Sequence, residues 1–141
     1  MRNCSDCTLC CTWLIGEAYG HTFGCGKSCA FKIPTGCSIY EKRPITCQKY
    51  QCAWLQGIIP YKYKPSTCGI IVSVEIWNNN QYLKAIETQQ QVMPNDLLND
   101  LITFCINNNC FLTFQKESVW YYYGSKDFIE FCNSKLEQVN T

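Results

Sequence analysis

Nine of the thirteen cysteines lie within the first 52 residues, and eight of them follow an order that indicates metal binding. The chain opens with Cys-x2-Cys-x2-Cys-Cys, in which sulfur atoms three residues apart can converge on one point. Cys-x2-Cys is the usual chelating pair for tetrahedral zinc. Disulfide bonds are the other chemistry that explains such a cluster. The candidate ligands are Cys4, Cys7, Cys10, Cys11, Cys29, Cys37, Cys47 and Cys52.

The composition favours metal thiolates over disulfides. Thirteen cysteines are an odd number, so they cannot all pair within one chain. No apolar stretch after Met1 resembles a signal peptide, and no run approaches the roughly 18 apolar residues that a membrane span needs. We therefore expect a soluble, cytoplasmic protein without a membrane segment, in a reducing compartment where neighbouring cysteines more often bind metal.

The adjacent pair Cys10 and Cys11 indicates more than one metal ion, because neighbouring side chains point in different directions. Eight thiolates divide into two sites of four cysteines each, and the sequence leaves open which four cysteines belong to each site. Zinc is the expected metal. Iron, including an iron–sulfur cluster in a metalloenzyme, is the alternative, since Cys4, Cys7 and Cys10 match the first three ligands of a ferredoxin-like run. The fourth cysteine of that run is not at the right step.

Three motifs define the cysteine-rich segment: C-S-D-C-T-L-C-C from Cys4, C-A-F-K from Cys29, and C-S-I-Y-E-K-R-P-I-T-C-Q-K-Y-Q-C from Cys37. Together with K-P-S-T-C-G-I-I from Lys64, they resemble the YkgJ-type cysteine-cluster family, which is described as zinc- or iron-chelating. The resemblance covers roughly residues 4–72. It implies that the eight cysteines are metal ligands, and it implies no established reaction.

Two further residues could join the ligand set, and two could support it. Cys25 lies close to Cys29, and either could fill the fifth family position; Cys29 fits better because a phenylalanine follows it at the expected offset. His21, the only histidine, could complete a mixed site, although a loop histidine without metal is the preferred interpretation. Arg43 has a planar fork of donors for thiolates or a carboxylate. We expect Arg43 to contact the ligands without binding the metal itself, with Tyr40 packed beside it.

The elements that position these residues divide the chain in two. Residues 1–68 hold four of the five prolines and show little periodicity, so we expect an irregular segment stapled by metal. Residues 69–141 predict a small antiparallel sheet with two helices, in the order β-β-α-β-β-α. The fold class is therefore α+β, with both parts packed as one compact domain. The expected strands are 70–77, 81–87, 110–114 and 118–123, and the expected helices are 94–106 and one that begins after residue 125.

The charges are uneven. Residues 1–65 hold eight Lys and Arg against three acidic residues, whereas residues 66–141 hold four against eight. A basic half would suit nucleic acid, but these charges are better explained as counter-charges to thiolates. A metal ion held by four cysteines has no open coordination position for water or substrate. The sequence also contains no conventional set of catalytic residues. The sequence therefore favours a structural or chelating module with an unidentified protein partner over an enzyme or a zinc-ribbon-like nucleic-acid binder, and it leaves the oligomeric state open.

Overall fold

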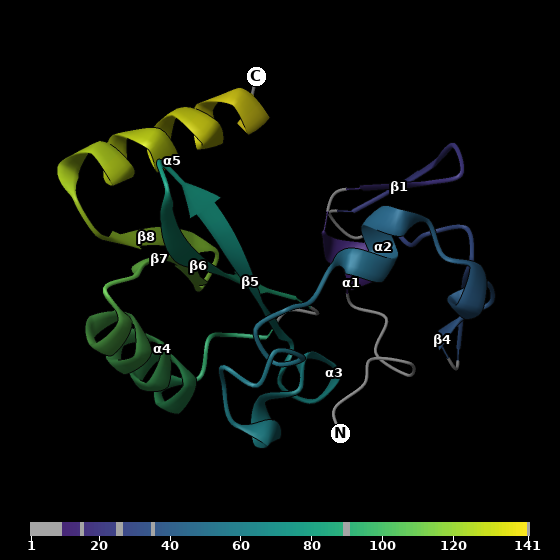
Figure 1. Ribbon diagram of the computed structural model, residues 1–141, viewed down its shortest axis with the longest axis horizontal. Coiled ribbons are helices and arrows are strands. Elements are labelled where there is room, and N and C mark those ends of the chain that lie inside the picture. Colours follow the sequence, from purple (N-terminus) through teal and green to yellow (C-terminus); the bar gives the residue numbers. More distant parts are fainter. Residues whose placement is uncertain (1–9, 15, 25–26, 35, 89–90, 141) are drawn as a thin grey trace.

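The computed structural model describes the backbone of residues 10–14, 16–24, 27–34, 36–88 and 91–140. Side chains are described for the same residues except 10, 11, 16, 46, 49 and 135–140. Figure 1 shows two parts, a sheet that lies between two long helices and a segment of short elements that lies to one side of it. Among the described residues, every helix is too short or too polar to span a bilayer.

The larger part is a four-stranded sheet in which the strands lie in chain order. The first and last pairs of strands are antiparallel hairpins, and the central pair is parallel. The strands are β5 (Ile70–Trp77), β6 (Asn80–Glu87), β7 (Phe111–Lys116) and β8 (Val119–Tyr123). The helices are α4 (Asn95–Asn108), between β6 and β7, and α5 (Lys126–Asn140), after β8.

The α+β class and the β-β-α-β-β-α order are confirmed, but the prediction of an antiparallel sheet is wrong at its centre. There Tyr82 of β6 pairs with Phe111 of β7, and Ala85 pairs with Phe114, in parallel register. The reason is the connection. Since α4 carries the chain back along the sheet before β7 begins, β7 enters from the same end as β6, as in any β-α-β crossover.

Both hairpins of the sheet have two-residue turns with left-handed backbone. Asn78 and Asn79, between β5 and β6, have φ angles of 50° and 63°, which asparagine tolerates well. Glu117 and Ser118, between β7 and β8, have φ angles of 54° and 67°, although neither residue type favours that region. The second turn therefore needs support from outside the hairpin, and the carboxylate of Glu87 provides it.

Glu87 lies at the end of β6 and accepts hydrogen bonds from three backbone N–H groups. Its Oε2 accepts from Met93 N at 2.8 Å and from Glu117 N at 2.9 Å, and its Oε1 accepts from Ser118 N at 2.8 Å. One side chain thus ties β6, the chain leading into α4 and the β7–β8 turn together. Its own N–H donates to Gln115 Oε1 at 3.0 Å.

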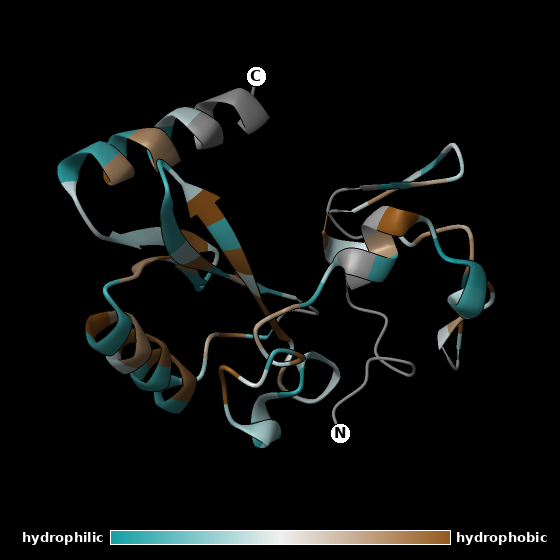
Figure 2. Cartoon of the chain, viewed as in Figure 1, coloured by the Kyte–Doolittle hydropathy of each residue, from teal (hydrophilic) through white to brown (hydrophobic). Residues whose placement is uncertain are grey.

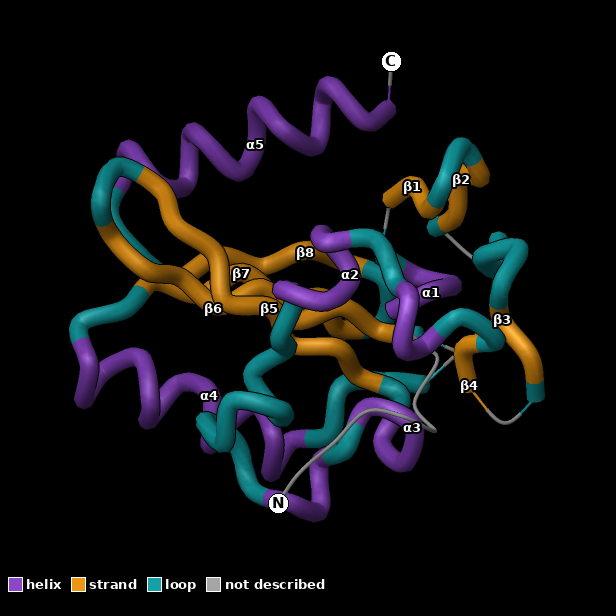
Figure 3. The backbone as a smooth tube through the Cα atoms, turned by 45° about the vertical axis from the view of Figure 1, so that its right-hand side comes forward, coloured by secondary structure: helices purple, strands orange, loops and turns teal. Residues whose placement is uncertain are grey.

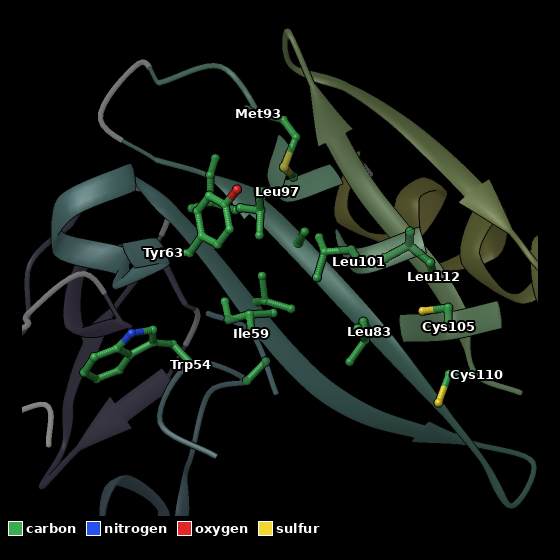
Figure 4. Packing of buried hydrophobic residues seen from close by; sticks show 14 residues of the cluster. Trp54, Ile59, Tyr63, Leu83, Met93, Leu97, Leu101, Cys105, Cys110 and Leu112 are labelled. Carbon is green, nitrogen blue, oxygen red and sulfur yellow. The ribbon is translucent and has the colours of Figure 1, made fainter. Parts of the chain in front are cut away.

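The sheet buries a hydrophobic core on each face. On one face, α4 packs against the central strands, and residues from 53 to 63 complete the same cluster (Figure 4). That cluster includes Trp54, Ile59, Tyr63, Leu83, Met93, Leu97, Leu101, Cys105, Cys110 and Leu112. On the other face, Phe128 of α5 is fully buried among aromatic rings of the sheet, which include Trp77, Tyr82 and Phe111.

The chain from residue 50 to residue 69 is tied to the sheet by specific bonds. Ala53 N donates to Val72 O at 2.7 Å, and the Tyr50 and Ser73 hydroxyls lie 2.7 Å apart. Two short elements follow, η2 (Tyr61–Tyr63) and α3 (Pro65–Cys68). Gly69 ends α3 with φ +76°, and a Cβ there would lie 2.4 Å from Gln91 Cγ, so only glycine fits without a shift. The sheet core thus extends across the expected boundary at residue 68.

The cysteine-rich segment is built from short elements. They are α1 (Cys10–Trp13), β1 (Gly16–Ala18), β2 (His21–Phe23), β3 (Lys32–Ile33), β4 (Gly36–Cys37), η1 (Tyr40–Lys42) and α2 (Ile45–Lys49). Figure 2 shows β1, β2 and η1 mainly in pale or hydrophilic colours, whereas β5 and α4 carry large hydrophobic stretches. Among the described residues from 12 to 51, the buried apolar side chains are Ala18 and Cys29. The segment therefore has very little hydrophobic core of its own.

Candidate metal centre

The structure describes the side chains of four of the eight predicted ligands. Cys29 lies before β3 and is buried, with 8% of its surface exposed, and Cys37 ends β4. Cys47 lies within α2, Cys52 follows α2, and both are partly buried. For Cys10 and Cys11 the structure describes the backbone, which belongs to α1. The remaining predicted or possible ligands lie outside the described residues: Cys4, Cys7 and Cys25.

A small polar cluster joins α1, which carries Cys10 and Cys11, to the loop that carries Cys29. Thr12, which follows Cys11 in α1, is buried, and its Oγ1 lies 3.2 Å from Ser28 Oγ. Ser28 directly precedes Cys29. The bond therefore places α1 beside the loop that carries Cys29, although 16 residues separate the two hydroxyls in the sequence.

Lys32 adds the strand that carries Cys37 to this cluster. Its Nζ donates to Thr12 Oγ1 at 3.4 Å, and its backbone N–H donates to Cys29 O at 3.0 Å. In the β3–β4 ladder, Lys32 is the direct partner of Cys37. Side chains of directly opposed residues lie on the same face, with Cβ atoms about 5 Å apart. Lys32 thus contacts α1, the loop of Cys29 and the strand of Cys37. Nothing in the sequence pattern had assigned Lys32 to the metal site.

Arg43 holds the turn that leads to Cys47. Its Nε donates to Tyr40 O at 2.8 Å, and its Nη1 donates to Cys47 O at 3.4 Å. Its guanidinium carbon lies 3.9 Å from the centre of the Tyr40 ring, a close cation–π contact. Arg43 therefore contacts the backbone of Cys47, and Tyr40 packs against Arg43. Nε and Nη1 of Arg43 both donate to backbone carbonyls, whereas the sequence suggested thiolates or a carboxylate.

His21 makes a ring contact on the surface of the segment. Its side chain is exposed and meets the ring of Phe31 edge to face, with centroids 5.4 Å apart. Tyr19 contacts the same ring at 6.0 Å, and its hydroxyl donates to Lys42 O at 2.6 Å. The bond to Lys42 holds the β1–β2 hairpin against η1, directly before Arg43 and Pro44. His21 thus lies in β2 and not in a loop, and its ring packs against Phe31.

The described side chains include four of the candidate metal ligands, Cys29, Cys37, Cys47 and Cys52. Among the described residues, no three His, Cys, Asp or Glu side chains form a group that could hold a metal ion. Figures 1 and 3 both show α1, which carries Cys10 and Cys11, beside α2, which carries Cys47. The donors that this region offers are cysteine sulfurs, which suit zinc and iron better than hard cations.

The cysteines of the sheet part have a different environment. Cys105, Cys110 and Cys132 are buried, whereas Cys68 is only half-buried. Cys105 Sγ donates to Phe111 O at 3.6 Å, and Cys110 Sγ donates to Asn108 O at 3.6 Å. Burial, with a smaller contribution from Cys110, raises the pKa of the Cys105 thiol to about 12, and burial also raises the pKa of Cys110. These two residues therefore remain thiols at neutral pH, unlike metal ligands.

The Cys105 thiol makes stability depend on alkaline pH. Its pKa is about 12 in the folded protein and near the ordinary 9.0 in the unfolded chain. Between those values the unfolded chain has released a proton that the folded protein retains, so the free energy of unfolding falls as pH rises. We expect urea unfolding at pH 8, 9.5 and 11 to show a shallower decline for Cys105→Val than for the wild type.

A decline of equal slope in both proteins would contradict this assignment. Part of the decline remains in the variant, because burial and the nearby Glu75 raise the pKa of Tyr82 to about 12 as well. Tyr82 lies on the opposite face of the sheet, under α5. The variant therefore isolates the contribution of Cys105 from that of the tyrosine.

The candidate sulfur ligands of the cysteine-rich segment come from several short pieces of chain. Backbone and hydroxyl contacts around Lys32 and Arg43 bring those pieces together, while the buried cysteines of the sheet part stay protonated. Compared with known proteins, the chain matches no family model, no curated protein and no solved structure.

Proposed function

We propose that this chain is a metal-chelating cysteine-cluster protein that holds about two zinc ions in a structural or binding role. The proposed ligands are eight of the nine cysteines between residues 4 and 52, all except Cys25, in a cytoplasmic protein whose thiols stay reduced. The resemblance of residues 4–72 to the YkgJ-type family supports this proposal. The observation that carries it is the contact of Thr12, Ser28 and Lys32, which brings the neighbours of Cys11, Cys29 and Cys37 together.

The scarcity of core in the cysteine-rich segment also supports the proposal. With Ala18 and Cys29 as the buried apolar side chains among the described residues from 12 to 51, hydrophobic burial contributes little there. Segments of this kind need a disulfide or a metal to fold. Structural zinc contributes about 10–16 kcal/mol of binding free energy in zinc-finger peptides, and that energy becomes folding free energy.

The experiment that tests the proposal is elemental analysis of protein purified without added metal, together with its absorption spectrum. We expect two zinc ions per chain and no visible absorption, because zinc is a d¹⁰ ion. One metal per chain would contradict the two-site arrangement, and a folded protein without metal would contradict the proposal as a whole.

The same measurement tests the iron alternative. Two or more iron atoms per chain with a brown or red colour would replace zinc by iron or an iron–sulfur cluster. The ligand set would then remain as proposed, and the metal assignment would change.

A further inference from the structure

Lys32 has a half-buried ammonium group among the ligand-bearing pieces of chain. Its nitrogen contacts the hydroxyl of Thr12, its backbone contacts the carbonyl of Cys29, and its partner across the ladder is Cys37. In the described part of the chain, this ammonium contacts a hydroxyl and no carboxylate. Both described acidic residues of the segment, Glu17 and Glu41, are exposed.

A partly buried cation without an anionic partner is unfavourable, because burial removes water that would solvate the charge. A zinc ion with four thiolates supplies the missing anion, since its net charge is about −2. The opposed position of Lys32 and Cys37 places the cation on the face where that charge would lie.

We propose that Lys32 is the positioning residue of the metal centre: its ammonium joins α1 to the Cys29 loop and compensates the negative charge of the thiolate–metal group. This inference rests on the proposed function. It differs from the expectation at the sequence level, where Arg43 and Tyr40 were the supporting residues. Arg43 contacts the carbonyl of one candidate ligand, whereas Lys32 contacts three of the pieces that carry ligands.

The test compares zinc affinity, measured by competition with a chromophoric chelator, in the wild-type chain and three variants. Lys32→Gln keeps a donor for Thr12 and removes the charge, and Lys32→Arg keeps the charge. Groups that orient metal ligands typically change metal affinity by 10–100-fold when they are replaced. We expect Lys32→Gln to bind zinc about tenfold more weakly and Lys32→Arg to stay within about twofold of the wild type.

Lys27→Gln is the matched control, because it makes the same charge change in the same segment. Lys27 is exposed, and its Nζ donates to Thr22 Oγ1 at 3.2 Å, so its ammonium does not contact Thr12. We expect its zinc affinity to match that of the wild type. Equal weakening by Lys27→Gln and Lys32→Gln would overturn the inference, since only the total charge would then matter.

The outcomes separate the inference from the proposed function. If the wild type binds no metal, the proposed function fails. If the wild type binds two ions and Lys32→Gln binds them equally well, only the inference fails. Equal losses in Lys32→Gln and Lys32→Arg would also overturn it, because the preserved charge would have had no effect. Urea unfolding of the sheet part, followed by its tryptophan fluorescence, should be the same in all four proteins.

Discussion

Replacing Cys29 by serine is expected to remove at least one metal ion per chain and to loosen the cysteine-rich segment. Cys29 is the most buried of the predicted ligands whose side chains are described. A serine hydroxyl does not ionise at neutral pH and so cannot replace a thiolate on zinc. The remaining thiolates would lose their ion, and the folding free energy that the metal contributes would be lost with it. Elemental analysis measures the first effect.

The loosening can be measured by hydrogen exchange of backbone amides, residue by residue. Amides of residues 10–52 should exchange faster in Cys29→Ser, while amides of β6 and β7 should keep their protection. The sheet has its own core on both faces, so it does not depend on the metal ligands. A uniform loss of protection throughout the chain would instead mean that the two parts unfold as one unit.

Cys110→Ser is the matched control. Cys110 is about as buried as Cys29, at 6% against 8%, but its thiol contacts the carbonyl of Asn108 at the end of α4 and its pKa is raised by burial. This variant should lose about 1–2 kcal/mol of stability and keep its full metal content. If Cys29→Ser also keeps two ions, Cys29 is not a ligand, and a loss of metal in Cys25→Ser would give Cys25 that position.

The sequence predicted the elements of the sheet part well, because their hydrophobic patterns are local. The expected strand 70–77 matches β5, and the helix expected from Pro94 begins at Asn95 and extends two residues beyond Ile106. The direction of β7 could not be read from any local pattern. It depends on the packing of α4 across the sheet, which turns two predicted hairpins into one mixed sheet.

For the candidate site, the sequence predicted the ligand types and left their neighbours open. Spacing alone identified the cysteines, because a metal requires several sulfurs within reach of one point. The contact of Lys32 with Thr12 depends on strands of two residues, whose register no periodicity specifies. Arg43 was identified through its Arg-Pro motif, but its bonds to carbonyls follow from the turn between η1 and α2.

The role of Glu87 also could not be predicted from the local sequence, and its replacement is expected to have a large effect on stability. In the sequence it is the last residue of an alternating strand. In the structure its carboxylate accepts from Met93, Glu117 and Ser118, which other elements bring to it. We expect Glu87→Ala to lower the free energy of unfolding by about 2–3 kcal/mol, because three backbone donors lose a charged acceptor. The expected loss of stability is smaller than the sum of three charged hydrogen bonds, because the N–H groups of Glu117 and Ser118 lie at the exposed turn and can bond to water.

Glu75→Ala is the matched control, since Glu75 is an exposed glutamate on the neighbouring strand β5. Its stability should stay within about 0.5 kcal/mol of the wild type, as for most surface substitutions. Glu87→Gln should fall between the two, because the amide keeps one acceptor oxygen for the turn. Urea unfolding of all three measures the effect, and the midpoint should shift without a change in slope. If Glu87→Ala is as stable as Glu75→Ala, the left-handed turn at Glu117 and Ser118 is stable by itself, and its hydrogen bonds to the Glu87 carboxylate add nothing to the stability of the fold.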